Sequence, residues 1–259
     1  MHDIPITISI VTFKDRFELV KELIQNIRSF EGSGFDILLS INGNNEEETS
    51  EDYRSEILNF CAQTKRCYPF FYPEFKSLCK LWNQSVISSR TDYNFIICDD
   101  VLYLKANILN QIKNCIAATG EQFFKINNEF SHFVVTKKAL HEVGYFDERF
   151  IAHGEEDGDM IYRYQDLYKK SFPDIYVAGL QNLACYDLQS ANVDYIDRKP
   201  TVNKKIHNKK YEITSDGVEV MTSKIKKVWK DEKQYPYEMF VLKNKHNIKQ
   251  FTDLDISYD

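Results

Sequence analysis

Two clusters of carboxylate residues are the part of this sequence best suited to chemistry. Asp99 and Asp100 stand side by side directly after the apolar run Asn94–Cys98. Adjacent carboxylates repel each other, and burying them costs free energy unless a cation or hydrogen bonds compensate. A hard divalent cation would compensate, and it would also neutralise a bound phosphate group. The pair therefore predicts a cation and phosphate site, whereas the alternative interpretation is a solvated loop that begins with aspartate.

The second cluster is an acidic turn that comprises Glu155, Glu156, Asp157 and Asp159. Capping of a following helix would explain one or two of these residues, because a helix N-terminus favours negative charge. An EF-hand loop is excluded, since counting from Asp157 places Ile161 where the loop requires an oxygen ligand. The remaining interpretation is a general base, because neighbouring carboxylates raise the pKa of one of them and make it a better base.

The elements that must position these clusters alternate between strand and helix along the first hundred residues. Short apolar, β-branched runs predict strands at Ile6–Phe13, Phe35–Ile41, Tyr68–Tyr72 and Asn94–Cys98. Helical spacing of apolar residues predicts helices between and after them, over Phe17–Phe30, Glu46–Gln63, Leu78–Ser89 and Ile108–Ile116. This alternation is typical of a parallel sheet covered by helices, with the ligand site at the carboxyl ends of the strands.

Later elements are shorter. Two strands are predicted at Gln122–Ile126 and Phe133–Thr136, followed by a short helix that leads to Gly144 and a helix over residues 160–168. Apolar residues at helical spacing between Val218 and Trp229 predict one more helix. We therefore expect an α/β fold with a mostly parallel sheet flanked by helices. Residues 1–200 would form the catalytic domain, and residues 201–259 a basic, partly helical C-terminal extension packed on it.

Charge is unevenly distributed along the chain. The net charge is −6, yet Lys and Arg outnumber Asp and Glu between Arg198 and Lys249. An acidic body with a basic tail argues against a nucleic-acid binder, whose basic residues would line a groove or face. The tail is either solvated or in peripheral contact with phosphates or an anionic membrane surface.

Cysteine usage and hydropathy bear on localisation. The six cysteines are scattered and include no CxxC pair. This pattern argues for buried free thiols in a reducing compartment rather than a disulfide framework or a zinc site. The first residues contain no basic region before an apolar run, and no stretch is long and apolar enough to span a membrane. We expect a cytoplasmic protein, peripheral at the inner face of the membrane if the basic tail binds there.

The order of these blocks resembles the inverting GT-A glycosyltransferases of family two, and the segment from Gly144 to Arg163 is its most specific part. That family carries a Gly-x-Phe-Asp-x-x-Phe stretch, a Glu-Asp pair, an Asp two residues on and an Arg four residues later. These fall on Gly144, Phe146, Asp147, Phe150, Glu156, Asp157, Asp159 and Arg163. His153 and Gly154 are distantly similar to the Trp-Gly-Gly-Glu-Asp segment of the family seven galactosyltransferases.

The resemblance implies a GT-A, Rossmann-like fold and a glycosyl transfer reaction. The expected donor is a nucleoside diphosphate sugar, with UDP-sugar favoured, and the expected acceptor is a hydroxyl group of a saccharide or glycolipid. Transfer would invert the anomeric carbon and would serve surface polysaccharide or glycolipid synthesis. The donor would be bound by Thr12, Phe13, Arg16, Asn42 and Asp99. Asn42 stands where the family often has an Asp that hydrogen-bonds uracil, and its amide oxygen can accept the same bond.

The resemblance also implies metal and catalytic roles. Asp100 matches the last carboxylate of the family's Asp-x-Asp motif and would bind Mn²⁺ or Mg²⁺, whereas the first position of that motif is Cys98. Many members supply a late His to the metal; the matching stretch NLACYDLQS has none, and His207 is the candidate farther on. Asp157 would deprotonate the acceptor hydroxyl group, and Glu156 would orient the acceptor.

Two other functions stay open at this point. The departures at Cys98 and at the late His are compatible with a degenerate, non-catalytic GT-A domain that serves as a binding subunit. A sugar nucleotidyltransferase also uses strand-end carboxylates in an α/β sheet. It would normally carry a Gly-rich phosphate loop after the first strand, and the segment TFKDR contains no glycine.

Overall fold

The computed structural model describes residues 4–12, 16–43, 51–73, 75–150, 154–183, 203, 207, 211–213 and 219–221. The chain divides into two compact units. Unit 1 comprises the spans Met1–Lys76, Leu81–Ala139 and Phe172–Ala191. Unit 2 comprises Ser77–Lys80, Leu140–Ser171 and Asn192–Asp259. Phe13 lies outside the described residues, so the structure does not test its predicted role.

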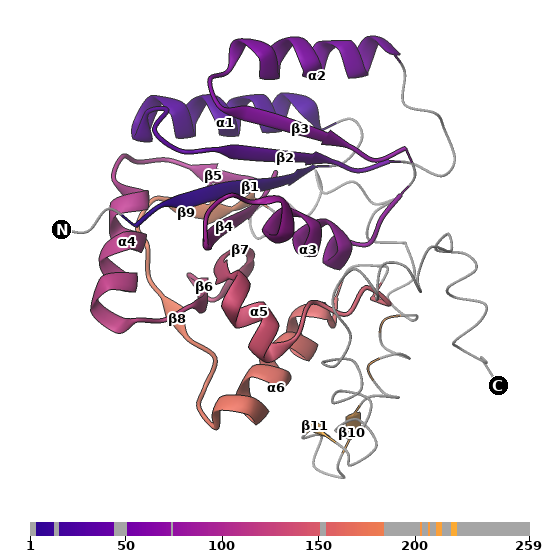
Figure 1. Ribbon diagram of the computed structural model, residues 1–259, viewed down its shortest axis with the longest axis vertical. Helices are drawn as coiled ribbons and strands as arrows, with labels where there is room; N and C mark the ends of the chain where they lie inside the picture. The colour runs from indigo at the N-terminus through magenta and orange to yellow at the C-terminus, as the bar shows by residue number, and fades with distance from the viewer. Residues whose placement is uncertain are drawn as a thin grey trace. The chain divides into compact units, whose positions relative to one another are not determined.

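Unit 1 is built on a seven-stranded sheet with the strand order β3-β2-β1-β4-β7-β6-β8 (Figure 1). Neighbours among β1 to β4 pair in parallel, as do β6 and β8, while β7 is antiparallel to both β4 and β6. The predicted mostly parallel sheet is therefore confirmed. The strands are β1 (Ile6–Thr12), β2 (Ile37–Ile41), β3 (Cys67–Phe71), β4 (Tyr93–Cys98), β6 (Phe123–Ile126), β7 (Glu129–Thr136) and β8 (Asp174–Ile175).

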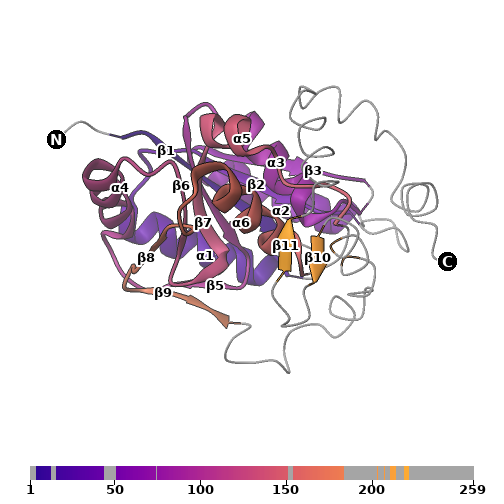
Figure 2. The ribbon, with the colours of Figure 1, turned by 90° about the horizontal axis from the view of Figure 1, so that it is seen from below.

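Helices cover both faces of this sheet, and every residue of β1 and β2 is buried, although one face also carries buried polar residues such as Thr7 and Ser9. One face packs against the buried residues of α1 (Phe17–Glu31), α2 (Glu51–Gln63) and α4 (Ile108–Thr119). On the other face, Trp82 of α3 (Leu78–Ser88) meets Phe133 of β7, with their ring centroids 5.2 Å apart. Figure 2 shows α1 and α3 on opposite sides of the strands.

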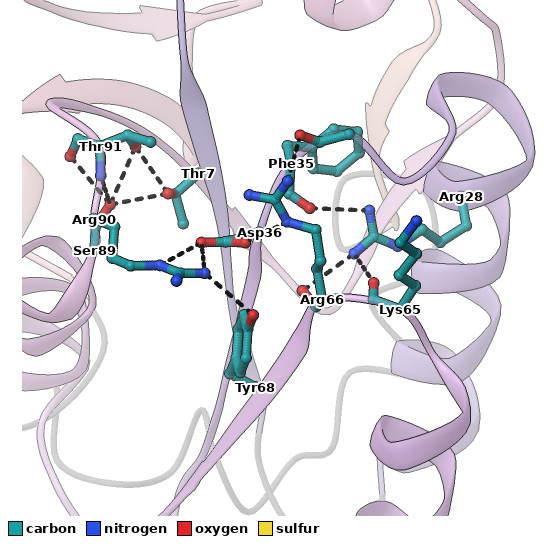
Figure 3. Close-up of polar contacts among 11 residues, drawn as sticks. Thr7, Arg28, Phe35, Asp36, Lys65, Arg66, Tyr68, Ser89, Arg90 and Thr91 are labelled. Carbon is teal, nitrogen blue, oxygen red and sulfur yellow. Dashed lines mark hydrogen bonds and ion pairs between the residues drawn. The ribbon is translucent and has the colours of Figure 1, made fainter.

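Polar side chains tie the strands together at the amino ends of β2 and β3 (Figure 3). Asp36, which precedes β2, accepts hydrogen bonds from Arg66 Nε at 2.7 Å and from Arg90 Nη2 at 2.6 Å. Although burial opposes the charged form, these hydrogen bonds hold the pKa of Asp36 below its ordinary value. Arg90 also donates to the hydroxyl group of Tyr68. This network stabilises the amino ends of these strands, whereas Asp99 and Asp100 follow the carboxyl end of β4.

The remaining elements include one pair of strands that the sequence patterns did not predict. Unit 2 contains α6 (Glu156–Tyr168), and α5 (Lys137–Val143) crosses from unit 1 into unit 2. The antiparallel pair β5 (Val101–Tyr103) and β9 (Leu180–Asn182) was not predicted, because three residues are too few to show a period. No helix in the described part of the chain is long and apolar enough to cross a membrane.

The predicted helix of the C-terminal extension is wrong at three residues. Glu219–Met221 forms strand β11, which pairs with β10 (Tyr211–Ile213), so its backbone hydrogen bonds run to another strand instead of along a helix. The rest of the predicted helix lies outside the described residues. The division into a domain over residues 1–200 and an extension over residues 201–259 stays a prediction.

Candidate functional site

Asp99 and Asp100 follow β4 in unit 1, and a single arginine bridges them. Arg16 Nη1 lies 3.1 Å from Asp99 Oδ1, and Arg16 Nη2 lies 3.3 Å from Asp100 Oδ2. Burial disfavours the guanidinium cation, but the two carboxylates more than offset this and raise the pKa of Arg16. The protein thus compensates the repulsion within the aspartate pair with its own positive charge.

Strand register explains why these residues meet. β1 and β4 are parallel neighbours in which Val11 pairs with Cys98, so the next residues along, Thr12 and Asp99, are brought to the same edge. There Thr12 Oγ1 donates a hydrogen bond of 2.7 Å to Asp99 Oδ2, and Asp99 is only 5% exposed. Thr12, Arg16, Asp99 and Asp100, four of the residues predicted for the donor and metal site, therefore lie together.

Asp100 has one carboxylate oxygen to which no described residue donates a hydrogen bond. Its Oδ1 atom is buried and has no hydrogen-bond partner among the described residues, while its backbone oxygen accepts from the N–H of Leu183 at 2.8 Å. An orphaned carboxylate oxygen beside a second carboxylate fits a hard divalent cation. No three His, Cys, Asp or Glu side chains of the described part of the chain gather as a metal-binding group. Such a cation would therefore need phosphate and water ligands as well, which is typical of Mg²⁺.

His132 is a titratable residue of this region that the sequence analysis did not single out. It lies in β7 and pairs across the sheet with Ile97 of β4, the strand that leads to Asp100. Burial lowers the pKa of His132 to about 4, although the charge of Asp100 opposes the shift. Its Nδ1 atom lies 2.9 Å from Ser131 Oγ, and its Nε2 atom is buried without a hydrogen-bond partner among the described residues. The imidazole is therefore neutral at neutral pH.

Asn42 follows β2 and is buried, but its side chain is engaged with the backbone. Asn42 Nδ2 donates to the carbonyl oxygen of Lys76 at 2.9 Å, and Oδ1 accepts from the Lys76 N–H at 2.8 Å. The backbone N–H of Asn42 donates to the oxygen of Thr12 at 3.0 Å. Asn42 thus joins the ends of β1 and β2 to the segment before α3. Its predicted contact with a base stays a prediction and would use the second lone pair of Oδ1.

In unit 2, the acidic turn forms the start of α6, and its carboxylates divide by environment. Asp159 is committed to Arg163, because Arg163 Nε donates to Asp159 Oδ2 at 2.8 Å and both side chains are buried. Arg163 Nη1 also donates to the oxygen of Tyr145 at 2.8 Å. This pair is a structural clamp between α6 and the segment that follows α5.

Glu156 is buried at the start of α6, next to Asp157. Burial, reinforced by the charge of Asp157, raises the pKa of Glu156 to about 8. Asp157 itself is half-exposed, and its Oδ1 atom accepts from the N–H of Gly158 at 2.8 Å. Glu155 precedes the helix with a left-handed backbone (φ 73°) and makes no capping hydrogen bond through its side chain. The predicted raised pKa in this turn therefore falls on Glu156.

His207 also lies at this turn. Its Nδ1 atom is 3.5 Å from Glu155 Oε2, and its ring centroid is 5.9 Å from that of Tyr162. The imidazole is almost completely buried. The structure thus places His207 beside the acidic turn of unit 2, and its predicted role as a metal ligand stays a prediction.

The segment between α5 and the acidic turn is anchored by its aromatic residues. Gly144 ends α5 with a left-handed backbone (φ 94°), and Phe146 and Phe150 are both buried. Asp147 binds Arg149 through two hydrogen bonds, of 2.9 Å to Nε and 2.6 Å to Nη2. These motif residues position the turn, and within the motif only the acidic residues at the start of α6 offer chemistry.

Comparison with known proteins shows a match to one family model and a similarity to several solved structures. The model of the family described as "Glycosyltransferase like family 2" matches residues 82–240. A search of curated proteins finds no matching relative.

Among solved structures, the mannosyltransferase PcManGT from Pyrobaculum calidifontis has a TM-score of 0.54 at 9% identity, over 68% of this chain and 55% of that one. Glucosyl-3-phosphoglycerate synthase from Mycobacterium tuberculosis has a TM-score of 0.51 at 9% identity, over 74% of each chain. Residues 1–349 of S. aureus TarS give 0.50 at 10% identity, over 68% of this chain and 58% of that one. The chain thus spans less than two thirds of TarS and PcManGT. These likenesses confirm the GT-A fold.

Proposed function

Because the chain belongs to the glycosyltransferase-like family 2, we propose that it transfers a sugar from a nucleoside diphosphate sugar to a hydroxyl group, with inversion of the anomeric carbon. The observation that carries the proposal is the cluster of Thr12, Arg16, Asp99 and Asp100 at the carboxyl ends of β1 and β4. Ligands of open α/β sheets bind at this edge, and this cluster combines a carboxylate that has an orphaned oxygen with a cationic side chain.

The donor half of the reaction rests on residues of unit 1. Asp100 would hold Mn²⁺ or Mg²⁺ through its orphaned Oδ1 atom, and such an ion offsets the negative charge that grows on the departing nucleoside diphosphate. Arg16 is 28% exposed in its side chain and can turn from the aspartates toward a diphosphate oxygen. Asp99, fixed by Thr12, would then accept a hydrogen bond from a hydroxyl group of the donor ribose or sugar.

The acceptor half rests on the acidic turn of unit 2. Asp159 is committed to Arg163, and Glu156 is buried and protonated at neutral pH, so Asp157 is the motif carboxylate left to act as the base. Asp157 would take the proton of the acceptor hydroxyl group as its oxygen attacks the anomeric carbon. A single displacement needs one base on the attacking side and inverts the configuration. Protonated Glu156 can donate a hydrogen bond that orients the acceptor.

The chemistry of the structural relatives supports this choice of donor and cation. Their structures include TarS with UDP-GlcNAc, PcManGT with GDP-Man and Mn²⁺, and the phosphoglycerate synthase with UDP-glucose and Mn²⁺. We propose a UDP-sugar donor here and a saccharide or glycolipid acceptor in surface polysaccharide synthesis. The protein would work in the cytoplasm, with its basic C-terminal region in contact with the inner face of the membrane.

A screen of nucleotide sugars tests the proposal. Thermal unfolding is followed with UDP- and GDP-sugars, each with and without Mn²⁺ or Mg²⁺, because a specific ligand stabilises the folded protein by mass action. We expect one sugar nucleotide to raise the Tm only when metal is present. Asp100→Ala should abolish the metal-dependent part, and Asp52→Ala on the exposed side of α2 is the matched control.

An assay of nucleoside diphosphate release from the same sugar nucleotides separates an enzyme from a binding subunit. Release of nucleoside diphosphate in the presence of metal, through slow hydrolysis or transfer, supports the catalytic function. Binding without any release would identify a non-catalytic GT-A domain. If no sugar nucleotide changes the Tm with either metal, the proposed donor class is wrong.

A further inference from the structure

Two cysteines of unit 1 face each other across a short loop. Cys61 lies in the last turn of α2, and Cys67 is the first residue of β3. Their Sγ atoms are 3.6 Å apart, within hydrogen-bonding distance, and the two residues are 4% and 7% exposed. Both are free thiols. A pair at this separation needs only a small movement to form a disulfide bond.

The loop between the two thiols is held in place by backbone hydrogen bonds. The N–H of Thr64 donates to the oxygens of Phe60 and Cys61, and the N–H of Cys67 donates to the oxygen of Thr64. Arg28 of α1 donates to the oxygen of Lys65 at 2.7 Å (Figure 3). The sulfur atoms are therefore positioned by the fold rather than by chance approach of two mobile side chains.

Arg28 also creates an electrostatic difference between the two sulfurs. Its Nε atom is buried and has no hydrogen-bond partner among the described residues. The hydrogen bond between the two thiols, together with the charge of Arg28, lowers the pKa of Cys67 despite the opposing effect of burial. The same hydrogen bond and burial raise the pKa of Cys61. Cys67 is thus the thiol of the pair that gives up its proton more readily, and Cys61 is the resolving thiol.

We propose that Cys61 and Cys67 form an oxidation site that takes a hydroperoxide and closes to an intramolecular disulfide. The Cys67 thiolate attacks one peroxide oxygen, the O–O bond breaks, and a sulfenic acid forms while hydroxide leaves and is protonated to water. The Cys61 sulfur then attacks the Cys67 sulfur, the S–O bond breaks, and the departing hydroxide takes the Cys61 proton. Two thiols and one H₂O₂ thus become one disulfide and two waters.

The expected consequence is a firmer attachment of α2. Ile57 and Cys61 of this helix are buried, and Tyr53 and Phe60 pack partly buried against the core, where both rings contact Phe17. A bond from Cys61 to Cys67 would join the helix covalently to the edge strand β3. The pair lies at the amino end of β3, whereas Asn42 follows the carboxyl end of β2, so this site is separate from the proposed donor site.

Peptide mapping tests the proposal directly in the reduced, folded, full-length protein. Trypsin cleaves after Lys65 and Arg66, so Cys61 and Cys67 fall on separate peptides, residues 55–65 and 67–76. After brief treatment with H₂O₂ and alkylation of remaining thiols, we expect a disulfide-linked pair of these peptides that a dithiol reductant separates. Cys79 falls on a third peptide, residues 77–80, and should be recovered alkylated.

Substitutions define the order of events. Cys61→Ser should leave Cys67 as a sulfenic acid that a dimedone probe captures, whereas Cys67→Ser should give no captured sulfenic acid at Cys61. Cys115→Ser, which removes a half-buried cysteine elsewhere, should leave the linked peptides unchanged. Arg28→Gln should slow disulfide formation by about threefold or more, because the thiolate fraction falls, and Arg54→Gln is its control on α2.

Two results would overturn the proposal. The first is folded protein in which other cysteines are oxidised while no peptide 55–65 becomes linked to peptide 67–76. The second is a Cys61→Ser protein in which Cys67 is captured no more than Cys115. Hydrogen exchange in α2 gives an independent readout, and equal exchange in the reduced and oxidised protein would refute the tethering of the helix.

Discussion

Arg163 and Asp159 form an ion pair of 2.8 Å inside α6, and their side chains are 2% and 0% exposed. Arg163 also donates to the backbone oxygen of Tyr145, so the pair joins the helix to the segment after α5. Both residues belong to the motif that resembles family two. Their geometry assigns them to positioning the acidic turn rather than to contact with a substrate.

Breaking this pair should destabilise the protein strongly. Arg163→Met leaves the Asp159 carboxylate buried without its partner, which typically costs about 3–5 kcal/mol of unfolding free energy. Lys169→Met, at the residue that follows the same helix, is the matched control, because its pair with Asp166 is exposed and worth roughly 1 kcal/mol or less. Urea unfolding measures both. A loss for Arg163→Met no larger than that of the control would contradict the clamp.

Glu156 should make stability depend on pH in a defined direction. Its pKa is about 8 in the folded protein, against an ordinary value of 4.5, so the folded state holds a proton that the unfolded state releases. Stability should therefore fall as pH rises between these two values, by roughly 1.4 kcal/mol per pH unit at most. Glu156→Gln should remove this slope, so the variant gains on the wild type as pH rises. Glu22→Gln on the exposed side of α1 is the control, and parallel curves for Glu156→Gln and wild type would refute the assignment.

Asp157 should be required for turnover and not for donor binding. Asp157→Asn removes the proposed base while preserving shape, and kcat should fall by about 10²- to 10⁴-fold. The donor Kd, measured by calorimetry with metal present, should stay nearly unchanged. Asp166→Asn, farther along α6, should retain kcat. Near-normal turnover in Asp157→Asn would show that the base is another group.

Arg16 should compete with the metal for the aspartate pair. Its guanidinium lies 3.1 Å from Asp99 and 3.3 Å from Asp100, where it offsets their negative charge. Arg16→Gln should therefore bind Mn²⁺ alone about tenfold more tightly, because a nearby cation has been removed. The same variant should bind the sugar nucleotide more weakly, because a phosphate partner is lost.

Electron paramagnetic resonance of free Mn²⁺ gives the affinity for Mn²⁺, and calorimetry gives the affinity for the sugar nucleotide. Arg54→Gln should change neither. Weaker Mn²⁺ binding in Arg16→Gln would show that the arginine does not compete for this site.

Local sequence patterns were enough to predict the framework of the candidate site. Strand and helix signals are local, so the alternation that builds a parallel sheet could be read from apolar spacing. Parallel strands end at one edge of the sheet, so the polar residue that ends β1 and those that follow β4 had to lie close together. Thr12 does contact Asp99. Phe13, which was also predicted to bind the donor, lies outside the described residues.

The burial and pairing of the polar groups depend on contacts that the sequence patterns do not reveal. Asp157 and Asp159 belong to the same acidic turn, but Asp159 is paired with Arg163 in the interior and Asp157 is half-exposed. The bond from Asn42 to Lys76 and the approach of Cys61 to Cys67 likewise depend on which segments pack together. Burial and pairing are set by contacts between residues distant in the chain, and these contacts determine charge state and availability, which spacing alone does not encode.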